Sequence, residues 1–76
     1  MELVLRPKPD AKPIDEQTAE RIRRVARADA AELAGGGAAV FAFSLPAEEA
    51  RGNLELAARF ELGAHWHTRY EVAAGR

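Results

Sequence analysis

The sequence has no cysteine and no excess of basic residues, and each absence excludes a class of protein. Without cysteine the chain has neither a disulfide framework nor a thiolate metal site, and it suits a reducing compartment. Eleven lysines and arginines against twelve acidic residues give a formal net charge of −1. A nucleic-acid-binding domain usually has a basic excess, because neutralised phosphates supply most of its affinity. Nucleic acid is therefore a disfavoured partner.

Long apolar runs are also missing. The longest weakly polar stretch, Leu33 to Leu45, is too short and too rich in glycine to cross a bilayer. No basic start is followed by an apolar segment, so we do not expect a signal peptide. These features predict a cytoplasmic protein with no membrane segment.

The C-terminal third of the chain alternates in polarity. Between positions 54 and 74 every even-numbered residue is uncharged and most odd-numbered residues are polar. A period of two is typical of a β-strand with one buried face. Gly63 is the natural turn residue in this segment. We therefore predict a hairpin with strands at 53–60 and 64–74.

The remainder of the chain predicts two strands around one helix. Asp15 is a suitable N-cap for a helix, and the glycines at 35–37 would end it. The segment around Phe41 and Phe43 is apolar on both faces, which indicates a central strand. The expected elements are a strand at 2–6, a proline-rich connection at 7–13, a helix at 15–34, a strand at 38–45 and a loop at 46–52.

Together these elements predict a single α+β domain of 76 residues. The expected topology is β-α-β-β-β, a four-stranded sheet with one helix packed on one face. A chain this short buries only about 60% of its unfolded surface, so its core is small. One helix is also too narrow to cover four strands, which predicts that some aromatic side chains stay exposed.

The aromatic end of the sheet is the predicted partner-binding surface, with Phe60, Trp66 and Tyr70 as anchors. Exposed apolar patches usually mark protein contacts, and aromatic residues dominate their energetics. Ser44 and Thr68 have no activating histidine at a recognisable spacing, so we expect no enzyme activity. The sequence thus predicts a non-enzymatic interaction or oligomerisation module, either a homodimer or a domain that docks a protein partner.

Two alternatives use other side chains. His65 and His67 would project from one face of a strand and could hold a metal ion or small ligand, although a zinc site needs at least three protein ligands. Arg23, Arg24 and Arg27 could contact nucleic acid from the outer helix face, but Glu20 has the spacing to pair with Arg24. No cofactor is implied by either pattern.

Asp29 conflicts with its surroundings in the predicted helix. At 100° per residue it falls among Ile22, Val25 and Leu33, in the middle of the apolar face. A buried carboxylate needs a hydrogen-bond donor, and the Tyr70 hydroxyl and the Trp66 indole are the nearest candidates. Asp29 is therefore predicted to be a structural polar residue in or beside the core, held by a hydrogen bond.

Overall fold

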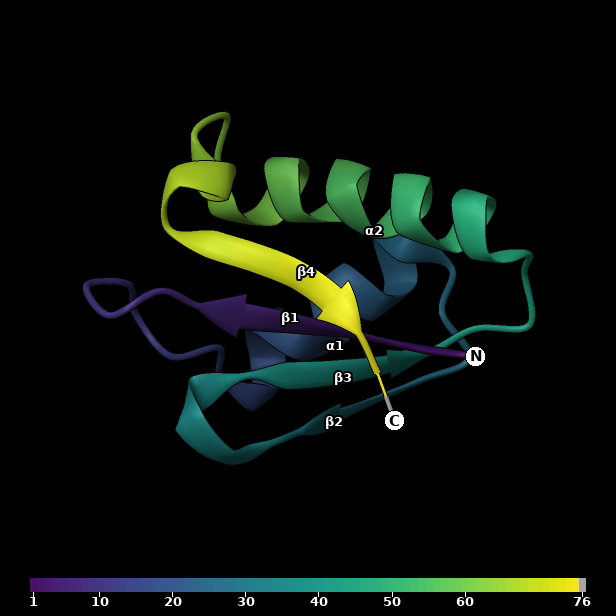
Figure 1. The fold of residues 1–76 in the computed structure, drawn as a ribbon, viewed down its shortest axis with the longest axis horizontal. Helices are drawn as coiled ribbons and strands as arrows, with labels where there is room; N and C mark the ends of the chain where they lie inside the picture. The colour runs from purple at the N-terminus through teal and green to yellow at the C-terminus, as the bar shows by residue number, and fades with distance from the viewer. Residues whose placement is uncertain (76) are drawn as a thin grey trace.

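The computed structural model describes residues 1–75 and contains four strands and two α-helices (Figure 1). Two single turns of 3-10 helix, η1 and η2, precede the third and the fourth strand. In chain order the elements are β1 (Glu2–Pro7), α1 (Glu16–Ala26), β2 (Ala30–Leu33), η1 (Gly35–Gly37), β3 (Ala39–Ala42), α2 (Ala47–Leu62), η2 (Trp66–Thr68) and β4 (Tyr70–Ala74).

The four strands form one antiparallel sheet in the order β2-β3-β1-β4. At the centre of the sheet, Leu3 of β1 lies opposite Phe41 of β3 on one side and Ala74 of β4 on the other. Each helix joins two strands that are separated by a third, which is the split β-α-β arrangement known as ferredoxin-like. The prediction of an α+β domain with a four-stranded sheet is confirmed. The one-helix β-α-β-β-β topology is wrong, because the chain forms a second helix.

That second helix, α2, replaces the first strand of the predicted hairpin at 53–60 and most of the predicted loop at 46–52. Ala50, Leu54, Ala57 and Ala58 are buried, and their spacing is that of one helix face. No valine, isoleucine or threonine occurs between positions 47 and 62, so the segment lacks the β-branched residues that favour strands. The predicted strand at 64–74 is shortened to β4, and a turn occupies the residues before it.

Helix α1 begins as predicted and ends eight residues early. Asp15 is its N-cap, and the carboxylate Oδ1 accepts a hydrogen bond of 2.7 Å from the Thr18 amide. Arg27 closes the helix in the left-handed conformation, with φ of 60°. The following residues form edge strand β2, and the Asp29 amide bonds to the Ala42 carbonyl at 2.8 Å. The predicted helix 15–34 therefore included a strand, and the three glycines turn β2 into β3 instead of ending the helix.

The core lies between the sheet and both helices. Leu5 of β1 and Phe41 of β3 are fully buried and belong to one cluster with Ile22 of α1 and Leu54 of α2. The two helices are also joined directly, since Arg21 Nε lies 2.9 Å from Glu61 Oε1. In addition, Asn53 Nδ2 donates to the Ala26 carbonyl, the last of α1, at 3.0 Å. The second helix thus covers sheet surface that one helix would have left open. Among the residues described, no helix has the length and apolar character needed to cross a membrane.

Candidate interaction surface

The three predicted aromatic anchors lie in different environments. Tyr70 is buried, with 8% of its surface exposed, and its hydroxyl donates to the Lys12 carbonyl at 2.8 Å. Trp66 is half-buried and packs against the core from η2. Phe60 is 75% exposed on the outside of α2. Tyr70 therefore belongs to the core and holds the proline-rich connection, whereas Phe60 is available to a partner.

An exposed apolar surface follows the outside of α2. Leu56, one turn before Phe60, is 63% exposed, and Gly52 lies one turn earlier on the same stripe. The stripe borders a shallow hollow of about 410 Å³ that Gly52 and Leu56 line together with Ala64 and Trp66, and whose polar lining is Glu55, Arg59 and His67. We call these five residues the α2 patch: Gly52, Leu56, Phe60, Ala64 and Trp66. Leu56 and Gly52 were missed from the sequence, although their spacing of four residues from each other and from Phe60 is the helical signal.

Two charged residues border the α2 patch. Glu55 faces Arg51 of the same helix, with Arg51 Nη1 and Glu55 Oε2 3.8 Å apart. The side chain of Arg59 is exposed and makes no ion pair or hydrogen bond with any other residue in the described range 1–75. The patch is thus apolar at its centre and carries one cation that is free to pair with an external group.

His65 and His67 do not lie on a strand. They stand in the turn between α2 and β4, where His67 is inside η2, and both are exposed. The His67 ring meets the Trp66 ring edge-on, with centroids 6.1 Å apart. Within residues 1–75 no three histidine, cysteine or acidic side chains come close enough to hold a metal ion. The strand geometry that suggested a shared ligand is therefore wrong.

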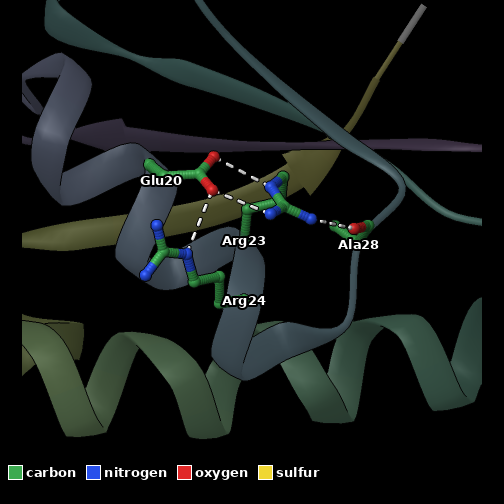
Figure 2. A network of polar contacts seen from close by, with 4 residues as sticks. All are labelled: Glu20, Arg23, Arg24 and Ala28. Atoms are coloured by element: carbon green, nitrogen blue, oxygen red, sulfur yellow. Dashed lines mark hydrogen bonds and ion pairs between the residues drawn. The ribbon is translucent and has the colours of Figure 1, made fainter.

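Two of the three arginines considered for nucleic-acid binding, Arg23 and Arg24, are engaged by one carboxylate (Figure 2), and the third, Arg27, is exposed at the end of α1. Glu20 Oε2 lies 2.7 Å from Arg23 Nη2 and 3.1 Å from Arg24 Nε, so the predicted Glu20–Arg24 pair is present. Arg23 also donates to the Ala28 carbonyl at 3.1 Å, beyond the end of the helix. The hydrogen bonds from Arg23 and Arg24 lower the pKa of Glu20 to about 2. This network stabilises the end of α1 and offsets part of the positive charge that a nucleic acid would contact.

The Glu20 network should make stability depend on pH. Because its pKa falls from 4.5 to about 2 on folding, ionised Glu20 stabilises the fold above about pH 4.5, and this contribution is lost as pH falls towards 2. We expect the melting temperature of the wild type to fall more over this interval than that of Glu20→Gln. Glu16→Gln is the matched control, since it removes a carboxylate from the first turn of α1 and leaves the network intact. Parallel pH profiles for wild type and Glu20→Gln would contradict the assignment.

Asp29 is exposed, and the prediction that it lies in the core is wrong. It follows the end of α1, so the helical geometry that placed it among apolar residues does not apply. Its carboxylate accepts a hydrogen bond from the Ser44 hydroxyl, in place of Tyr70 or Trp66. Asp29 thus links the start of β2 to the end of β3.

A second depression lies between α1 and β2. It has a volume of about 830 Å³, and Ala19, Ala31 and Leu33 contribute its apolar part. Its rim carries Arg21 and Arg24, which are already paired with Glu61 and Glu20 respectively. Because these charges are satisfied within the chain, this groove offers a ligand less than the α2 patch does.

No protein-family model, curated protein or solved structure matches this chain, so its function is argued from the α2 patch itself.

Proposed function

We propose that this chain is a small non-enzymatic interaction module that docks a protein partner through the α2 patch. The observation that carries the proposal is the exposure of Phe60, at 75%, directly beside Leu56, at 63%, on one helix. Single exposed apolar residues are ordinary on protein surfaces. Here two large ones lie one helical turn apart, and Leu56 also lines a hollow with the half-buried Trp66, an arrangement that resembles the aromatic centre of a protein interface.

Burial by a partner would recover hydrophobic free energy that the isolated chain does not use. Burying an exposed leucine or phenylalanine side chain in full is worth about 1.5–3 kcal/mol. Leu56 and Phe60 contribute little to their own fold, because most of their surface already faces solvent. Leu56 and Phe60 therefore contribute most hydrophobic free energy when a second surface covers them.

The alternatives drawn from the sequence have weaker support. A metal or small-ligand site at His65 and His67 lacks a third ligand among the described residues. A nucleic-acid surface at Arg23, Arg24 and Arg27 would have to compete with Glu20 for two of its three cations.

A photo-crosslinking experiment tests the proposal. We would replace Phe60 with benzoylphenylalanine in the full chain, expressed in its native cells, and irradiate. A discrete crosslinked product is expected from position 60. The matched control carries the same group at Ala34, which is exposed beyond the end of β2 and outside the patch. If position 60 gives no more discrete product than position 34, the α2 patch is not a docking surface and the proposal fails.

A further inference from the structure

Building on this proposed function, we infer that the partner is a second copy of the chain. In the inferred dimer the two α2 helices cross antiparallel about Leu56. Phe60 of each chain then lies over Gly52 of the partner subunit, in the hollow beside Trp66. Three independent features of α2 support this arrangement: a helix glycine that the fold does not explain, the spacing of the apolar stripe, and the positions of Glu55 and Arg59.

Gly52 is in the interior of α2, where glycine costs about 1 kcal/mol relative to alanine. A glycine is often kept in a helix because another part of the chain approaches too closely for a side chain. That reason does not apply, since a Cβ at position 52 would meet nothing within 4 Å. The space above Gly52 is open, and Gly52 lines the same hollow as Leu56 and Trp66. A second chain packing closely against this position accounts for the glycine.

The apolar stripe is complementary to its own two-fold image. Gly52, Leu56 and Phe60 are four residues apart and so form one ridge along the helix surface. Two such ridges pack when helices cross at about 50°, the commonest class of helix packing. Phe60 and Gly52 are each four residues, about 6 Å, from Leu56 in opposite directions. With the two-fold axis at Leu56, Phe60, the largest side chain of the ridge, packs over the partner's Gly52, which has no side chain.

The charges agree with the same axis. Glu55 and Arg59 lie on the same edge of the ridge, one residue before and three residues after Leu56. The two-fold rotation keeps that edge together and reverses the helix direction. For antiparallel helices the four charges then follow one another along the axis at intervals of about 3 Å, in the order Arg59, the partner's Glu55, Glu55 and the partner's Arg59. Each of the two central glutamates therefore has an arginine of the other chain on its outer side. Arg59 has no ion pair or hydrogen bond to another side chain within residues 1–75. The dimer therefore supplies the missing partner twice.

Charge reversal with mixing tests the geometry, using sedimentation velocity on the full chain. We expect the wild type to dimerise. Arg59→Glu alone and Glu55→Arg alone should each weaken dimerisation at least 10-fold, because each sets like charges together at both ends of the interface. An equimolar mixture of the two variants should form a heterodimer, since both pairs become attractive again. The chain that carries both substitutions should recover the homodimer.

Gly52→Leu supplies an independent test of the hollow. The added side chain has open space within its own chain, so circular dichroism should show an intact fold while dimerisation is lost. Ala34→Leu is the control, because it adds a side chain of the same size at a position that is exposed beyond the end of β2 and outside the α2 patch, and it should leave the dimer unchanged.

The outcomes separate this inference from the proposed function. A wild type that remains monomeric at several hundred micromolar overturns the dimer. A dimer that ignores the charge reversals, or whose variants do not recombine, overturns the antiparallel geometry. A crosslinked product from position 60 with a mass other than twice that of the chain also overturns the dimer, and in that case docking of a different protein through the α2 patch still holds.

Discussion

Leu54→Ala should lower the free energy of unfolding by about 2–5 kcal/mol, whereas Leu56→Ala should lower it by less than about 0.5 kcal/mol. Leu54 is fully buried in the core between α2 and the sheet, and truncation leaves a cavity there. Leu56 is 63% exposed, and its side chain loses few contacts within the chain. Urea denaturation at a protein concentration below that of self-association would measure both values.

The pair of variants decides between a helix and a strand at this segment. In a strand the two leucines are two residues apart and share a face, so their truncations would cost similar amounts. In α2 they point about 200° apart around the helix axis. Equal losses for the two variants would therefore contradict the helix. Leu62→Ala, at a partly buried position near the end of α2, should give an intermediate loss and serves as the internal reference.

The same segment explains why the sequence predicted too many strands. Leu54, Ala58 and Leu62 satisfy both a period of two and a helical spacing of four, so alternation alone could not separate the two structures. The deciding residue is Ala57, which is buried although it occupies an odd position. The absence of β-branched residues across α2 is a second signal for a helix, and it outweighs the alternation.

Other parts of the fold followed from local chemistry, and some could not. Asp15 caps α1 as expected, because a carboxylate that accepts from the third amide of a helix is a local interaction. The end of α1 depends on Arg27 in a left-handed conformation, which non-glycine side chains seldom adopt and which nothing in the adjacent sequence indicates. Once the helix ends there, Asp29 leaves the apolar face and becomes exposed.

The candidate surface was predictable in part. Of the three residues predicted as aromatic anchors, Phe60 is exposed, although it lies on a helix and not on a sheet, whereas Trp66 is half-buried and Tyr70 is buried. Leu56 was assigned to the buried face with Leu54, and Gly52 to a loop, because the strand pattern gives both of them the wrong environment. Gly52, Leu56 and Phe60 lie on one stripe only if the segment is a helix, so this surface can be predicted only after the helix itself has been predicted correctly.

Gly37→Ala should lower the free energy of unfolding by about 2–4 kcal/mol, through backbone strain and steric overlap together. Gly37 has φ of +78°, in the left-handed region, and an added Cβ would lie 2.8 Å from Pro13 Cβ and 2.9 Å from Pro13 Cα. The overlap would also disturb a hydrogen bond nearby. The Gly37 carbonyl accepts from the Ile14 amide at 2.9 Å, and this bond holds the segment before α1 against the turn between β2 and β3.

Gly36→Ala separates the two causes of this loss. Its φ of +74° is nearly the same, but a Cβ at position 36 meets nothing within 4 Å. We therefore expect a cost of only about 1 kcal/mol, from the left-handed backbone alone. Denaturant unfolding of both variants gives the difference, which is the cost of the steric overlap between the added methyl group and Pro13. If Gly37→Ala were no more destabilising than Gly36→Ala, the close packing of Pro13 against the turn, and with it the anchoring of the proline-rich connection, would be wrong.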